Sequence, residues 1–107
     1  MNRTNLEHAL FGLLLQLPFG IAGVLAVDAF GVPALSPILW AVGAVAAVFF
    51  FLGREHAQQE YRITGGGPVN GLMPWQGFLG WSKDTLWDFL APLLATVAVA
   101  LVMWVRA

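Results

Sequence analysis

The side chains of this 107-residue chain that could do chemistry are concentrated in one polar stretch, GREHAQQEYR, at residues 53–62. On a helix, His56 and Glu60 are four residues apart and therefore share a face, which suits a metal site or acid–base catalysis at a membrane surface. A catalytic zinc site, however, needs three protein ligands, and the other histidine, His8, is far away in sequence. We therefore expect no catalytic residue, no metal and no cofactor.

Two non-catalytic interpretations of the same stretch remain open. In the first, it is a solvated helix end held by i,i+4 pairs that contribute about a few tenths of a kcal/mol each. In the second, its polar face pairs with neighbouring copies of the chain in an oligomer. The residues of this candidate contact face are Arg54, Glu55, His56, Gln59, Glu60 and Arg62.

Composition indicates a membrane protein whose main partner is the lipid bilayer. Hydrophobic residues make up 59% of the chain and charged residues only 10%, whereas soluble domains are about 45–50% apolar and about 25% charged. The chain has no cysteine, which excludes a disulfide scaffold and a cysteine nucleophile. A net charge of -1 argues against nucleic acid as a partner, because nucleic-acid binders carry clustered Lys and Arg.

The charged residues leave three long charge-free runs, at 8–27, 29–53 and 89–105. About 20 apolar residues in a helix cross the hydrocarbon core, and lipid cannot satisfy an open backbone. We therefore predict an all-α membrane protein, with the whole chain, 1–107, forming a single transmembrane domain. The three predicted transmembrane helices cover about 5–28, 37–63 (whose C-terminal part protrudes from the membrane) and 83–105.

Local signals set the predicted helix ends. Thr4 and Glu7 fit a capping box at the start of the first helix, and Pro18 should kink that helix. Ser36 is placed to cap the second helix, and Ser82 to cap the third.

Between the second and third helices we predict a Gly/Pro-rich linker and an interfacial aromatic segment, together residues 64–81, with the aromatic part at 72–81. Tryptophan prefers the headgroup layer, where its ring stays apolar and its N–H stays wet. The predicted interfacial anchors are Trp75, Phe78, Trp81 and Trp87.

The positive charges predict an orientation. Arg54, Arg62 and Lys83 lie between the second and third spans, while the short turn between the first two carries only Asp28. Because Lys and Arg concentrate on the cytoplasmic side, the N-terminus and the 54–88 loop should be cytoplasmic.

The spans themselves favour self-association over transport. No ionisable residue falls at mid-depth, which disfavours an ion-coupled transporter. Gln16 offers a hydrogen bond between copies, and small residues at i,i+4 spacing favour close helix packing, so we expect a homo-oligomer. These predicted helix-packing residues are Ala22, Ala26, Gly43, Ala47, Ala91 and Ala95.

Residues 53–62, followed by a glycine run and by Met73, Pro74 and Trp75, resemble a set of small phage-encoded membrane proteins identified as holins or holin-like. The resemblance covers roughly residues 50–90. It implies a protein that oligomerises in the bacterial inner membrane and permeabilises it, so that an endolysin can act during host cell lysis. It also implies an antiholin or another membrane protein as a partner.

One departure from that family concerns topology. Three-span holins typically have an external N-terminus and a basic C-terminal tail, whereas the charge bias here predicts the reverse orientation, and the chain ends shortly after Arg106.

Two other functions remain as alternatives. One is a small interfacial enzyme acting on lipid headgroups through Glu55, His56 and Glu60, with Arg54 and Arg62 beside them. The other is an accessory or regulatory subunit that docks on a larger membrane protein.

Overall fold

The structure, a computed structural model, describes residues 3–67 and 74–106. Its elements are α1 (Arg3–Phe30), α2 (Leu35–Thr64), the short 3₁₀ helix η1 (Pro74–Phe78) and α3 (Lys83–Arg106). The three α-helices are each long and apolar enough to cross a membrane, and the described part of the chain contains no strand. The protein is thus an all-α, multi-pass membrane protein, as predicted. Residues 68–73 of the predicted linker, together with residues 1–2 and 107, lie outside the described residues.

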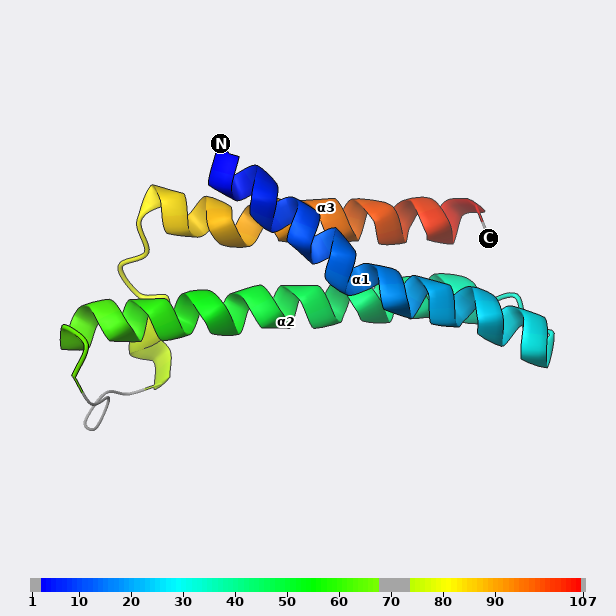
Figure 1. Cartoon of the computed structure of the whole chain (residues 1–107), viewed down its shortest axis with the longest axis horizontal. Coiled ribbons are helices and arrows are strands. Elements are labelled where there is room, and N and C mark those ends of the chain that lie inside the picture. The colour runs from blue at the N-terminus through cyan, green and yellow to red at the C-terminus, as the bar shows by residue number, and fades with distance from the viewer. Residues whose placement is uncertain (1–2, 68–73, 107) are drawn as a thin grey trace.

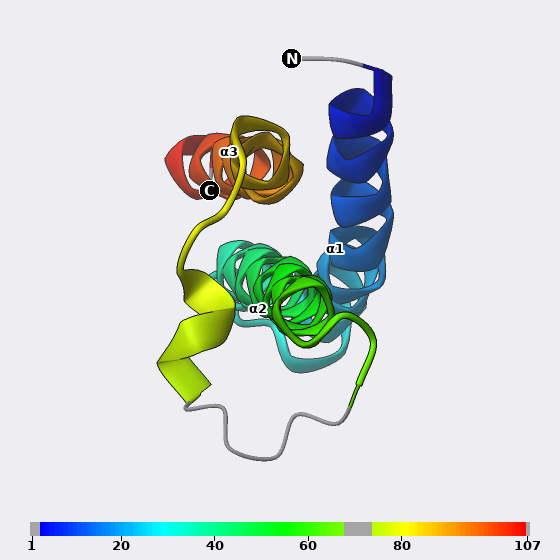
Figure 2. The same cartoon turned by 90° about the vertical axis from the view of Figure 1, so that its left-hand side faces the viewer.

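The three helices form a small bundle in which each contacts the other two. A short turn joins α1 to α2, and Gly31 in that turn has a φ of +67°, a conformation that glycine adopts without steric cost. Figure 1 shows α1 crossing over α2 while α3 runs alongside, and the end view in Figure 2 places the helices at three corners. The bundle is 52 Å long, longer than the hydrocarbon core of about 30 Å.

Helix α1 begins earlier than the capping box predicts and bends near its middle. Thr4 lies inside the helix, and Glu7 accepts a hydrogen bond from Arg3 Nε at 3.0 Å, so the prediction of Thr4 as a cap is wrong. Pro18 lies inside α1, and the helix changes direction along its middle part (Figure 1). A proline removes one backbone hydrogen bond and clashes with the preceding turn, which accounts for the bend.

Helix α2 is one continuous rod, as predicted, but it begins two residues before Pro37. The residue at its N-cap is Ala34, which makes no side-chain cap hydrogen bond, so Ser36 lies in the first turn and does not cap. The helix ends where Gly65 takes a left-handed conformation and donates its N–H to Arg62 O. This is the stop that the glycine run predicted.

The start of α3 follows the prediction. Ser82 Oγ accepts a hydrogen bond from the backbone N–H of Thr85 at 3.1 Å, which is the bond that an N-cap serine makes.

The helices meet along a face of α1 that the sequence analysis did not identify. Four buried residues follow one another at helical spacing and form what we call the glycine face of α1: Gly12, Gln16, Gly20 and Gly23. A Cβ built on Gly12 would lie 2.9 Å from Pro92 Cβ on α3. The missing side chains therefore let α1 approach its neighbours at close range.

Two predictions about packing within the membrane need correction. Gln16 is fully buried inside a single chain, so it does not pair between copies as predicted. In α1 the glycine face makes the contacts, whereas Ala22 is exposed and Ala26 half-buried. The remaining predicted packing residues differ in burial: Gly43, Ala47 and Ala91 are buried, and Ala95 is half-buried.

The outer surface of the bundle is apolar. Large hydrophobic side chains are exposed on every helix, among them Leu14, Phe49 and Leu101. A soluble protein rarely exposes apolar area on this scale, but in lipid these side chains are in their preferred solvent.

Candidate functional site

A cluster of polar side chains lies at the end of the bundle where α1 and α3 begin and where α2 extends beyond the charge-free run. We call it the end cluster; its members are Asn5, His8, Arg54, Glu55 and Asp88. Asn5 and Glu55 are fully buried, whereas the His8 and Asp88 side chains are 16% and 19% exposed. Most of this polar group is therefore shielded, with one side open to solvent.

The packing face of each helix leads directly into the end cluster. On α1, Asn5 and His8 continue the face of Gly12 and Gln16, because residues three and four apart are neighbours on a helix. On α2, Glu55 lies four residues after the buried ring of Phe51. The same close packing that holds the spans together therefore brings these polar groups to one place.

The contacts within the cluster are short. His8 Nδ1 lies 3.2 Å from Asp88 Oδ1, and Asn5 Nδ2 donates to the same oxygen at 2.6 Å. Arg54 donates to Glu55 Oε1 at 2.7 Å. One potential ligand atom from each of His8, Glu55 and Asp88 lies within 4.8 Å of the others, so three helices each supply an acid–base or metal-binding group.

Glu55 carries the largest electrostatic cost in the cluster. Its side chain is 0% exposed, and an ionised carboxylate is costly to bury unless it is paired. Arg54 supplies one partner while keeping part of its own side chain in solvent.

A second row of polar contacts fixes η1 and the start of α3 to α2. Gln59 Nε2 donates to Leu79 O at 2.7 Å, and Arg62 donates to Thr85 Oγ1 at 3.2 Å. These bonds hold the segment that follows the linker against the C-terminal part of α2, and they stabilise the geometry around the end cluster.

The predicted pair of His56 and Glu60 is present, with His56 Nδ1 3.3 Å from Glu60 Oε1. It lies apart from the end cluster, because the His56 ring packs on Phe78 of η1 with ring centroids 4.4 Å apart. The polar stretch 53–62 is thus divided between two faces of α2.

Two inferences from the sequence therefore need correction. Glu55 and Gln59 are buried within the single chain, so these two residues belong neither to a solvated helix end nor to the predicted contact face between copies. His8 lies beside Asp88 and Glu55, so its distance in sequence does not argue against a metal site. The signal that could have found the cluster is the helical spacing that places His8 and Glu55 on the packing faces of their helices.

The predicted aromatic anchors lie at the same end of the bundle. Trp75 and Phe78 are exposed, while Trp81 and Trp87 are half-buried. Trp81 Nε1 donates to Gly77 O at 2.8 Å. An indole ring whose N–H is bonded to the backbone and whose apolar faces are exposed fits an interfacial position. The depth of these rings in a bilayer stays a prediction.

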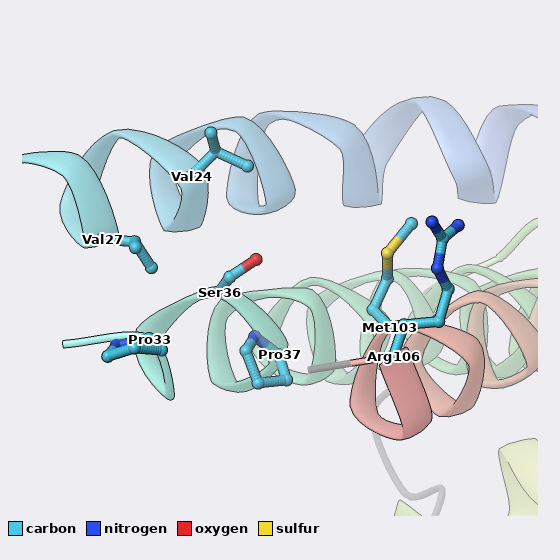
Figure 3. A pocket seen from close by; sticks show the side chains of 7 residues that line it. All are labelled: Val24, Val27, Pro33, Ser36, Pro37, Met103 and Arg106. Carbon is cyan, nitrogen blue, oxygen red and sulfur yellow. The ribbon is translucent and has the colours of Figure 1, made fainter.

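The opposite end of the bundle contains a groove of about 450 Å³ between the α1–α2 turn and the last turn of α3 (Figure 3). Its lining residues are Val24, Val27, Pro33, Ser36, Pro37, Met103 and Arg106. Among the described residues, the lining includes neither an acidic side chain nor a histidine, so the end cluster is the better candidate for a functional site.

Chemically, the end cluster combines an imidazole with two carboxylates. Such a set can move protons, pair with a cationic group or ligate a metal ion. Comparison of the chain with protein-family models, with curated proteins and with solved structures finds no match.

Proposed function

We propose that this protein is a holin-like membrane protein: it accumulates in the bacterial inner membrane, associates with further copies and permeabilises the bilayer, so that an endolysin can act on the cell wall. The observation that carries the proposal is the closed centre of the single chain. A Cβ built on Gly43 would lie 2.9 Å from Gln16, which leaves no space at that crossing for a water-filled path. A lesion would therefore have to form between copies.

A shallow groove on the outer surface supports association between copies. It lies between α2 and α3 and measures about 240 Å³. Ala41, Ala44 and Ala100 contribute small side chains to it, and Trp104 also lines it. Small residues let helix backbones approach closely in lipid, so a helix of a second copy fits this groove better than it fits the surrounding surface of larger side chains.

The charge distribution supports the proposed orientation. Arg54, Arg62 and Lys83 belong to the end of the bundle that holds the end cluster, and Arg106 ends α3 at the other. By the positive-inside tendency, the end cluster and the N-terminus face the cytoplasm.

Induced expression of the full chain with a potential-sensitive dye tests the proposal. We expect loss of membrane potential after a lag, and higher oligomers in mild detergent. The variant Ala100→Phe fills the groove and should delay the loss, whereas Ala98→Phe, at an exposed position outside the residues that line the groove, serves as its control. An unchanged potential at high expression of the wild-type chain would contradict the proposal.

A second candidate function is an interfacial enzyme acting on lipid headgroups. The specific observation in its favour is the convergence of His8, Glu55 and Asp88 beside Arg54, because an imidazole near carboxylates suits proton transfer and a guanidinium suits phosphate.

Turnover of phospholipid vesicles by the purified chain separates the two candidates. An enzyme should lose turnover in His8→Ala and in Glu55→Gln while its helicity and oligomeric state stay unchanged. A chain that depolarises cells and turns over no phospholipid would favour the first proposal.

A further inference from the structure

We propose that His8, Glu55 and Asp88 form a binding site for one divalent metal ion of the Zn²⁺ or Mn²⁺ class. The inference goes beyond the proposed function and does not depend on it, because a metal at this place would join three helices whether or not the chain permeabilises membranes.

The first argument is the geometry of the ligand atoms. One nitrogen and two carboxylate oxygens, each from a different helix, all lie within 4.8 Å of one another. Ligands about 2.0–2.2 Å from a tetrahedral metal are separated by about 3.4 Å. His8 Nδ1 and Asp88 Oδ1, at 3.2 Å, already have this spacing, and the Glu55 oxygen lies within 4.8 Å of both ligand atoms.

The second argument is the state of the His8 nitrogen. Nδ1 of His8 is buried and has no hydrogen-bond partner among the described residues, although it lies close to Asp88. A buried polar atom that makes no hydrogen bond costs free energy. A metal ion between the nitrogen and the carboxylates removes that cost, because neutral imidazole is a metal ligand through this lone pair.

The third argument is the support around the ligands. Asn5 Nδ2 donates to Asp88 Oδ1, and Arg54 donates to Glu55 Oε1, so both carboxylates are oriented from outside. The His8 ring packs against Phe51 with centroids 5.5 Å apart. Outer contacts of this kind are characteristic of metal sites, where they orient the ligands and tune affinity.

Charge balance points the same way. Two carboxyl groups face one guanidinium in the cluster, so the group carries an excess negative charge when both carboxyl groups are ionised and His8 is neutral. A divalent cation offsets that excess at close range, where burial makes the interaction strong. The part-exposed edges of His8 and Asp88 give an ion a path from solvent.

The donor set selects the class of metal. One imidazole nitrogen with two carboxylate oxygens suits Zn²⁺, Mn²⁺ or Fe²⁺, whereas Ca²⁺ and Mg²⁺ prefer sites made of oxygen alone. Three protein ligands leave at least one position for water or for an oxygen of a phosphate group.

The test is metal binding by the full chain, purified in mild detergent and freed of metal with a chelator. Isothermal titration with Zn²⁺ and with Mn²⁺ should give one ion per chain for at least one of them, with Mg²⁺ binding more weakly. Co²⁺ should give the visible absorption of a low-coordinate site that includes nitrogen. Absence of Zn²⁺ and Mn²⁺ binding above a protein-free blank would overturn the proposal.

Variants locate the ion. His8→Ala and Asp88→Asn should each weaken binding about tenfold or more, whereas the double variant His56→Ala with Glu60→Gln, which removes the other histidine–glutamate pair of α2, should bind as the wild type does. Far-UV circular dichroism checks that each variant keeps its helices. If a ligand variant loses its helices, the site is judged from the Co²⁺ spectrum of the wild type and from metal binding by the double variant. Loss of metal binding in the double variant would place the ion away from His8, Glu55 and Asp88.

Discussion

The side-chain amide of Gln16 donates a hydrogen bond to the backbone carbonyl of Thr96 at 2.9 Å, although the two residues are 80 positions apart in sequence. The same Nε2 also donates to Trp40 O at 3.0 Å. One side chain therefore links α1 to both other helices in the middle of the bundle. In lipid no water competes for these bonds, so they help define how the three helices fit together.

Replacement of Gln16 by Ala should destabilise the bundle by about 2–3 kcal/mol. The change removes two interhelical hydrogen bonds, which are worth about 0.6–1.7 kcal/mol each in a membrane, and it leaves a gap in the packing. Unfolding in mixed micelles with increasing SDS, followed by circular dichroism, measures the difference. Leu14→Ala, at a 63% exposed position of the same helix, is the control and should cost less than about 1 kcal/mol. Equal effects of the two changes would contradict the assigned role of Gln16.

A pair of glycines in α2 should respond in opposite directions to the same substitution. A Cβ on Gly43 would lie 2.9 Å from Gln16 Cγ, whereas a Cβ on Gly53 meets nothing within 4 Å. Gly43→Ala should therefore destabilise the fold by about 1–3 kcal/mol through overpacking. Gly53→Ala should be neutral or stabilising by up to about 1 kcal/mol, because alanine is the better helix former. The same SDS titration measures both, and a stabilising Gly43→Ala would show that α1 and α2 do not pack here.

Loss of the Ser82 cap should loosen the start of α3. Ser82→Ala removes the acceptor for the Thr85 N–H, and loss of such a cap costs about 1 kcal/mol. Amide hydrogen exchange in the first turn of α3 should then become about fivefold faster. Lys83→Ala, at the exposed neighbouring position, keeps the cap and should leave exchange nearly unchanged. Equal rates of amide hydrogen exchange in the two variants would rule out the capping role of Ser82.

The proposed orientation can be tested cleanly because the chain has no cysteine of its own. The test uses two single-cysteine variants at exposed positions. Val32→Cys lies in the turn between α1 and α2, and Tyr61→Cys lies near the end of α2. A membrane-impermeant maleimide should label Cys at position 32 from outside the inner membrane, and position 61 only after the membrane is broken. The opposite labelling pattern would establish the inverted topology that is typical of three-span holins.

The composition of the chain was enough to predict the three spans, since charge-free runs of this length are stable only as helices in lipid. The stop of α2 at the glycine run and the cap of α3 at Ser82 also followed from local chemistry. The starts of α1 and α2 did not, because Thr4 and Ser36 lie within the first turns. Capping signals are weak, at about 1 kcal/mol, and packing overrides them easily.

The sequence by itself determined that this is a three-span membrane protein, because hydrophobicity and helix length are properties of a single segment. Only the tertiary structure decided that Gln16 is used inside the chain and that His8 meets Glu55 and Asp88. These relations depend on which faces of different helices come into contact. Many pairings of apolar helix faces have similar free energies, and the sequence of one helix alone does not distinguish them. The glycine face of α1 resolved that choice by close packing, and the polar groups at its end came together as a consequence.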